Sequence, residues 1–155
     1  MLPERYRNSV AILEGGIDKY EAFSRIMESC SVVPDRAGFL SLVTERERIQ
    51  STGIGHGVAI AHGKRSSVDR VHIILGISRE GIRYDDEHEE KVHLIFMISS
   101  SFDDEPGYLK ALGAIISWVH DEKLRRDLVN LDMDNPDVVR FLDMFSNQEF
   151  SRYEN

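Results

Sequence analysis

The sequence has almost no cysteine, no long apolar run and no segment that directs export. Cys30 is the only cysteine among 155 residues, so no disulfide can form within the chain. A single thiol suits a reducing compartment. No apolar stretch approaches the roughly 20 residues of a membrane span, and the N-terminus lacks a basic segment followed by an apolar run. We therefore expect a soluble, cytoplasmic protein without stable membrane insertion.

Positive charge is scarce relative to negative charge. Lysine and arginine total 19 against 27 aspartates and glutamates, and the formal net charge is −8. Such a surface repels phosphate backbones and anionic lipid, so neither nucleic acid nor a membrane is an expected partner. It favours the docking of a basic protein instead. The sequence also lacks a cysteine cluster or a His-Glu-x-x-His spacing, so we expect no metal site and no cofactor.

Linkers and repeats are also missing. No stretch rich in proline, glycine and serine divides the chain, and no internal repeat is visible. A chain of this length fits one domain. We expect a single domain over residues 1–155, with a frayed tail over 147–155.

Apolar residues recur with two different periods along the chain. Helical spacing predicts helices over residues 18–29, 35–48, 109–119, 123–131 and 137–145. Short apolar segments predict strands over residues 9–13, 57–61, 71–76 and 92–98. Strands that are apolar on both faces lie centrally in a sheet that helices cover on both sides. The predicted fold class is α/β, with a mixed central β-sheet flanked by helices on both faces.

The helix over 109–119 carries the longest apolar stripe. Its members, which we expect to face the core, are Leu109, Leu112, Ile115, Ile116 and Val119.

The densest chemistry lies between residues 45 and 64. Glycines precede a short apolar strand that ends at His62-Gly63-Lys64, and the ends of buried strands are where open α/β sheets bind ligands. A neutral imidazole is a competent nucleophile toward phosphorus near pH 7. The donors available to hold an anionic phosphoryl group are Arg46, Lys64 and the hydroxyls of Ser66 and Ser67. By spacing alone, His62 also fits an incidental structural histidine.

Several short motifs favour a functional His62 over an incidental structural histidine. Arg46-Glu47, the run 51–55, the run 57–60 and His62-Gly63-Lys64 resemble the signature of enzyme IIA of the bacterial sugar phosphotransferase system, in its fructose/mannitol/nitrogen-regulatory type. The similarity continues through Gly81-Ile82, the strand over 92–98 and Tyr108-Leu109-x-x-Leu112. It covers nearly the whole chain after about residue 17.

The resemblance implies a cytoplasmic α/β domain that is phosphorylated on His62. The donor in that family is the histidine-containing phosphocarrier protein, and the arginine matched by Arg46 lies near the phosphohistidine. We expect Gly63, Lys64 and Ser66 to bind the phosphoryl group. The chain would then be a phosphotransferase component with a phosphohistidine intermediate.

The sequence departs from the family pattern at three positions. Ala61 stands where proline usually precedes the signature histidine, and Tyr108 replaces a second histidine. A phenol cannot carry positive charge beside the phosphoryl group at neutral pH. His56 shares side-chain parity with His62 along an extended strand, so it could supply the missing imidazole. A bent glycine loop could equally point it elsewhere.

Three functions remain open. The first is a regulatory phosphocarrier of the nitrogen type, favoured by Tyr108 and by the absence of a IIB-like cysteine motif and a membrane part. The second is a IIA subunit that passes phosphate to a IIB domain of a fructose/mannitol-type transporter. The third is a binding module of the same fold that transfers nothing. The expected partners are the phosphocarrier protein and either a IIB domain or a regulated target protein.

The remaining histidines favour structural roles. His72 and His93 fall within predicted strands, where we expect half-buried rings with hydrogen bonds and no metal. His88 lies in the acidic run 85–90, which we expect to be a solvated turn.

Overall fold

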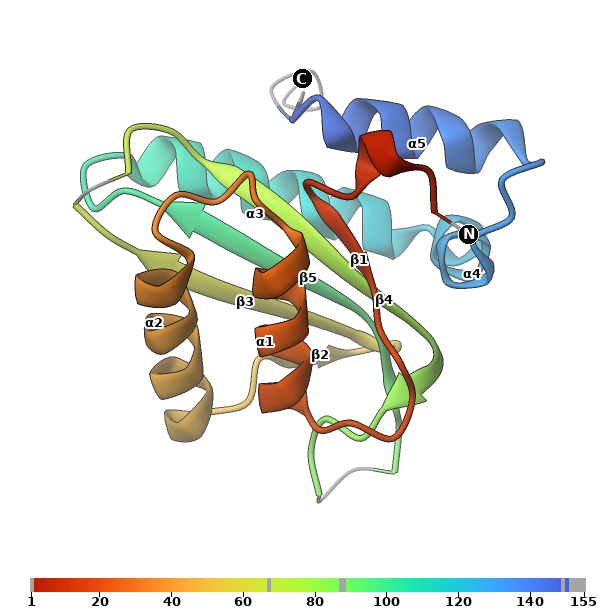
Figure 1. Cartoon of the computed structure of the whole chain (residues 1–155), viewed down its shortest axis with the longest axis horizontal. Coiled ribbons are helices and arrows are strands. Elements are labelled where there is room, and N and C mark those ends of the chain that lie inside the picture. The colour runs from red at the N-terminus through yellow and green to blue at the C-terminus, as the bar shows by residue number, and fades with distance from the viewer. Residues whose placement is uncertain (1, 67, 87–88, 149, 151–155) are drawn as a thin grey trace.

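The computed structural model describes residues 2–66, 68–86, 89–148 and 150 (Figure 1). A five-stranded sheet with the order β1-β4-β5-β3-β2 forms its centre. The strands are β1 (Val10–Ile12), β2 (Gly53–Gly55), β3 (Val58–Lys64), β4 (His72–Ile82) and β5 (Val92–Ser100). β3 pairs with β5 and β1 with β4 in parallel, whereas β4–β5 and β2–β3 are antiparallel. The sheet is therefore mixed, as the sequence predicts.

Helices cover both faces of this sheet (Figure 1). A 3₁₀ turn over Glu4–Tyr6 precedes β1, and the α-helices are α1 (Lys19–Ser29), α2 (Arg36–Ile49), α3 (Glu105–His120), α4 (Glu122–Asn130) and α5 (Pro136–Ser146). One apolar core joins the sheet to α1 and α2, and a second joins the opposite face to α3, α4 and α5. This arrangement confirms the predicted fold class. Within the described residues, no helix is long and apolar enough to span a bilayer.

Alternation along β3 decides which face each residue serves. Val58 and Ile60 pack in the core that contains α3, whereas Ala59 and Ala61 pack toward α1 and α2. Side chains two residues apart on a strand share a face. His62 therefore points toward α3, away from α2.

Gly63 explains how closely α2 approaches the end of β3. A Cβ atom at this position would lie 2.9 Å from two ring carbons of Phe39 on α2. Such a distance is too short for carbon atoms in contact. The glycine next to His62 is thus required for packing against α2.

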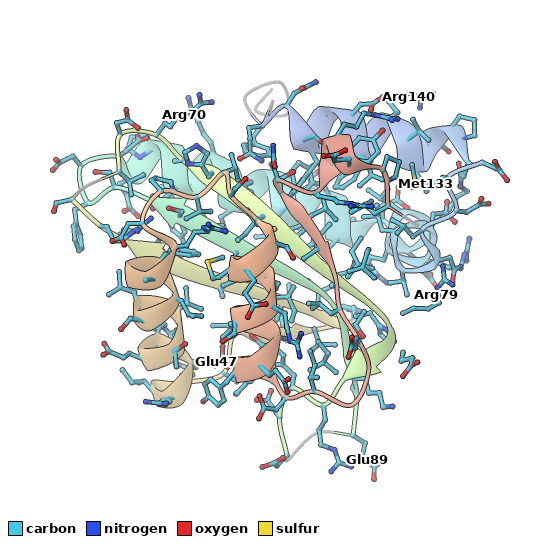
Figure 2. The ribbon with its side chains drawn as sticks, in the orientation of Figure 1. Glu47, Arg70, Arg79, Glu89, Met133 and Arg140 are labelled. Atoms are coloured by element: carbon cyan, nitrogen blue, oxygen red, sulfur yellow. The ribbon has the colours of Figure 1, made fainter. Side chains whose placement is uncertain are left out.

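A buried carboxylate fixes the other end of α2. Glu47 is only 2% exposed, and its carboxylate accepts hydrogen bonds from the Lys19 ammonium at 2.9 Å and from the Thr52 amide at 3.0 Å. Figure 2 shows this side chain between α1 and α2. Burying a carboxylate requires such partners. Glu47 therefore ties α1, α2 and the start of β2 together, which is a structural reason for the Arg46-Glu47 motif.

The main differences from the sequence prediction lie in the strands and at the start of α3. The predicted strand over 71–76 is much longer, because β4 runs to Ile82 and pairs with β5 as far as Val92. β3 runs on through His62 to Lys64, because it pairs with β5 up to Ser100. α3 begins at Glu105, earlier than its apolar stripe, because the Asp104 side chain caps it by accepting from the Gly107 amide at 2.9 Å. The strand β2 was not predicted, since three residues rich in glycine carry no strand signal.

Two residues in the tail that the sequence predicts to fray, Gln148 and Phe150, make contacts with the rest of the chain. The Gln148 side chain accepts from the Ile73 amide and donates to the Ile73 carbonyl, both at 2.9 Å. It thereby satisfies backbone groups of β4 that lie beyond the pairing with β1. Phe150 is 8% exposed and lies 6.0 Å from the Trp118 ring, between centroids. Residues 149 and 151–155 lie outside the described part.

Candidate functional site

His62 lies near the end of β3 with its half-buried ring held from two sides. The imidazole stacks on the Tyr108 ring of α3, with centroids 3.9 Å apart and an interplanar angle of 14°. Its Nε2 atom and the Ser100 hydroxyl of β5 form a hydrogen bond of 2.9 Å. The stack fixes the plane of the ring, and the hydrogen bond fixes its rotation within that plane.

A lysine and a carboxylate stand next to this ring. Lys64 shares the face of His62, and its ammonium lies 5.1 Å from the centre of the Tyr108 ring. The same ammonium forms an ion pair with the carboxylate of Glu105, the first residue of α3. The stacked rings and the ion pair therefore make one contiguous group.

The surroundings keep the imidazole uncharged. Burial lowers the pKa of His62 to about 4, and the Lys64 charge acts in the same direction, while Glu105 opposes it. Burial disfavours the cationic form of histidine, and a nearby positive charge does so too. The ring is neutral at pH 7, the state in which one nitrogen offers a lone pair.

Three large apolar side chains on α3 and in the segment just before it are exposed. Phe102, just after β5, is 66% exposed, and Leu109, next to Tyr108, is 55% exposed. Ile116 lies two helical turns further along α3 and is 51% exposed. Leu109 and Ile116 share one side of the helix by their spacing, and exposed apolar groups on one side favour a protein contact. We call these three residues the apolar rim.

The apolar rim corrects the prediction for α3. Ile115 is fully buried as expected, but Leu109 and Ile116 of the predicted core stripe are exposed. Apolar residues on this helix occupy more of its circumference than one core-facing stripe, since Ala111, Ala114 and Trp118 are also buried. More apolar residues than one core-facing stripe needs indicate that some of them lie on the surface of the protein.

Arg46 lies on the other side of β3 from the ring. Its guanidinium donates to the Gln50 carbonyl at 3.0 Å, and α2 packs on the face opposite His62. β2 covers β3 at Val58 and Ala59, and the Thr52 carbonyl accepts from Ile60. To reach a phosphoryl group on His62, the Arg46 side chain would have to pass around the edge of β3 after Ile60, where β2 no longer pairs with it.

Three residues follow the lysine at the end of β3, and the structure describes two of them. Ser66 is exposed in the turn after β3, and Ser67 lies outside the described residues. Arg65, which sequence reasoning missed, is 7% exposed. It donates to the Asp35 carbonyl at 2.7 Å and to Ser99 Oγ at 3.0 Å, on the face opposite His62. Arg65 therefore holds the start of α2 in place.

Of the two possibilities left open for His56, the structure has the bent glycine loop, which keeps this residue away from His62. His56 occupies the turn between β2 and β3 with a φ of 57°, whereas His62 is the fifth residue of β3. The four strand steps from Val58 to His62 alone span about 13 Å. The two residues therefore lie at opposite ends of β3, although their spacing in sequence gives them the same side-chain parity.

His72 and His93 are also far from each other. His72 pairs with Ser99 at one end of β5, and His93 is the second residue at its other end. His93 Nδ1 and the Ser78 carbonyl form the expected hydrogen bond of 2.9 Å. His72 is 8% exposed, and its Nδ1 has no hydrogen-bond partner among the described residues. His88 lies outside those residues.

Comparisons with known proteins agree on one family. The family described as "Phosphoenolpyruvate-dependent sugar phosphotransferase system, EIIA 2" matches residues 8–144. The fructose-specific EIIABC component of Bacillus subtilis is 29% identical over 110 residues, which cover 71% of this chain and 17% of that protein. The nitrogen regulatory protein of Bradyrhizobium diazoefficiens is 27% identical over 94 residues, 61% of either chain.

A solved structure has the same fold. The nitrogen regulatory protein IIA-Ntr from Neisseria meningitidis superposes with a TM-score of 0.72 at 23% identity, covering 88% of this chain and 93% of that one. The chain spans less than two thirds of the length of either sequence relative, at 17% and 61%. Those two relatives carry a sugar-specific name and a nitrogen-regulatory name.

Proposed function

The chain belongs to the EIIA 2 family of the phosphoenolpyruvate-dependent sugar phosphotransferase system, and we propose that it accepts a phosphoryl group on His62 from the histidine-containing phosphocarrier protein of the cytoplasm. One observation carries this proposal. A half-buried imidazole with a pKa of about 4 is stacked on Tyr108 beside the Lys64 ammonium. A neutral, oriented nucleophile next to a cation is what transfer of an anionic group requires.

The transfer is an exchange between two imidazoles. The lone pair of the unprotonated His62 nitrogen attacks phosphorus, and the N–P bond to the carrier's histidine breaks. The electron pair of that bond returns to the carrier's imidazole. His62 gives up its remaining ring proton and the carrier's imidazole takes one up, so that charge and protons balance. Lys64 offsets the charge of the arriving group, and Ser100 keeps the ring in its orientation.

The apolar rim supports a protein as the donor. Phe102 and Leu109 are exposed, and Leu109 follows the Tyr108 that stacks on the ring; interfaces between proteins centre on such apolar side chains. A carrier docked there brings its phosphohistidine to an edge of the His62 ring, because the lone pair of the attacking nitrogen lies in the ring plane and the stack on Tyr108 covers a face and not an edge. The net charge of −8 adds attraction for a basic docking face.

Within the family, a regulatory role of the nitrogen type is the version we favour. Tyr108 occupies the place where many members have a second histidine, and it stacks on His62 as a neutral ring. Without a second imidazole to carry charge, onward transfer is expected to be slow. Slow transfer suits a protein whose phosphorylation state is read by a target protein.

The alternative is a IIA subunit that passes its phosphoryl group to a IIB domain of a fructose/mannitol-type transporter. The fructose-specific name of the Bacillus subtilis relative favours it. A binding module of the same fold that transfers nothing is the third possibility.

Labelling separates these functions. The chain is incubated with radiolabelled phosphoenolpyruvate and the general phosphotransferase proteins, in wild-type form and as His62→Ala. Acid-labile label on the wild type that is lost in the variant supports the phosphocarrier. An unlabelled wild type supports the binding module and overturns our proposal.

A second stage tests the role. Purified IIB domains of the fructose and mannitol type are added to the labelled chain. Label that stays on the chain for minutes supports regulation, whereas label that passes to a IIB domain within seconds shows the transport role and overturns the regulatory one.

A further inference from the structure

The cation beside His62 is already engaged by a carboxylate. Lys64 forms an ion pair with Glu105, and the two side chains are 28% and 52% exposed. Glu105 begins α3, and Tyr108 follows one turn later on the same helix. The helix that supplies the stacked ring thus also supplies a negative charge to the site.

This charge opposes the group that His62 would receive. A phosphoryl group brings up to about two negative charges. It must compete with Glu105 for the Lys64 ammonium, and it is repelled by the Glu105 carboxylate. Both side chains already act on the ring: Lys64 lowers the pKa of His62, and Glu105 raises it.

We propose that Glu105 sets the phosphoryl-transfer potential of His62 by holding Lys64 in an ion pair. This proposal rests on the proposed function. Glu105 is a positioning residue that acts through Lys64: it withholds part of the cation from the phosphoryl group and so destabilises the phosphorylated form. The consequence is that the phosphoryl group stays easy to return or pass on. The site then follows the phosphorylation level of the carrier instead of trapping the group.

The equilibrium constant for exchange with the carrier measures this potential. Phosphocarrier protein and chain are mixed with a limiting amount of labelled phosphoryl group, and the label on each is counted at equilibrium. The distribution depends on the free energies of the four species and not on how fast the proteins dock. A role of Glu105 in docking alone would change the rate and leave the distribution unchanged.

We expect Glu105→Gln to move the distribution toward the chain by about threefold to tenfold, from Coulomb energies at the separations of such a site in a largely aqueous medium. Glu105→Asp keeps the charge and should stay closer to the wild-type distribution. Glu89→Gln is the matched control, because Glu89 is exposed in the segment before β5, at the far end of that strand from Ser100 (Figure 2). It removes the same charge and should leave the distribution unchanged.

Substitution of Lys64 tests whether Glu105 acts through this lysine. Lys64→Gln should shift the distribution toward the carrier, and in that background Glu105→Gln should have a smaller effect than in the wild type. High salt should also reduce the effect of Glu105→Gln, since the pair is partly exposed.

The outcomes separate the two proposals. A wild type that takes up no label overturns the proposed function. A labelled wild type with an unchanged distribution in Glu105→Gln, or one shifted toward the carrier, overturns the role of Glu105. An equal effect with and without Lys64 shows direct repulsion of the phosphoryl group and overturns the action through Lys64.

Discussion

At the scale of single residues, the chemistry depends on how His62 is kept neutral. Burial and Lys64 depress its pKa, while Tyr108 and Ser100 hold the ring. The neutral form persists from physiological pH down to about pH 5. Charge on the ring is therefore not expected to limit acceptance of a phosphoryl group near neutrality.

A nuclear magnetic resonance titration tests this directly. The ring protons of His62 should titrate with a midpoint of about 4. Lys64→Gln should raise the midpoint and Glu105→Gln should lower it, because the first removes a repelling charge and the second an attracting one. A midpoint of about 6.5 in the wild type, the value of a free imidazole, would contradict the account.

The same shift links folding to pH. The folded-state pKa lies below that of the unfolded chain, so the unfolded chain binds more protons between about pH 4 and 6.5. The free energy of unfolding therefore falls as the pH drops through this window. His72, whose pKa burial also lowers, acts in the same direction.

Sequence reasoning reached some of these residues and missed others for a clear reason. His62 and Lys64 lie in one short motif at the end of an apolar strand, so local pattern alone indicates them as candidate site residues. Ser100 is 38 residues from His62, and only the pairing of β3 with β5 brings it close. The position of His56 stayed open because side-chain parity tells which face of the strand a residue lies on and carries no information on distance along the strand.

At the scale of elements, the contact of α2 with the end of β3 positions the histidine. Gly63 allows Phe39 to lie against the strand at the residue after His62. Apolar patterning predicted both elements, but the glycine was taken as a phosphate-binding residue. Its packing role follows from a contact between segments 24 residues apart, which periodicity cannot reveal.

Gly63→Ala should lower the free energy of unfolding by about 1–3 kcal/mol, because the new methyl group overpacks against the Phe39 ring. Gly113→Ala on α3 is the control, since a Cβ there meets nothing within 4 Å. The control should raise stability by up to about 1 kcal/mol through helix propensity. Urea denaturation of both variants gives the comparison, and equal stabilities would refute the packing role.

At the scale of the whole molecule, the two apolar cores on the two faces of the sheet have different roles. The core with α1 and α2 holds the sheet from behind, through Glu47 at one end and Arg65 at the other. The opposite face carries α3, which supplies Tyr108 and Glu105 to the site and two residues of the apolar rim, Leu109 and Ile116. We therefore expect a partner protein to dock on the α3 side.

Phe102→Ser should slow phosphoryl transfer from the carrier about tenfold, as expected for the loss of an aromatic contact in an interface. The equilibrium distribution and the free energy of unfolding should not change, since Phe102 is 66% exposed. Ile49→Ser at the end of α2 is the control, because Ile49 is 83% exposed on the other side of the molecule. Equal transfer rates for the two variants would exclude the rim as the docking surface.

The most direct test of the central claim is to identify the atom that carries the phosphoryl group. The chain, phosphorylated with phosphoenolpyruvate and the general phosphotransferase proteins, is examined by phosphorus–proton correlation spectroscopy at neutral pH. We predict a single phosphorus signal that correlates with the ring protons of His62 and disappears in His62→Ala. A signal on any other residue, or no phosphorus signal in the wild type, would contradict the account.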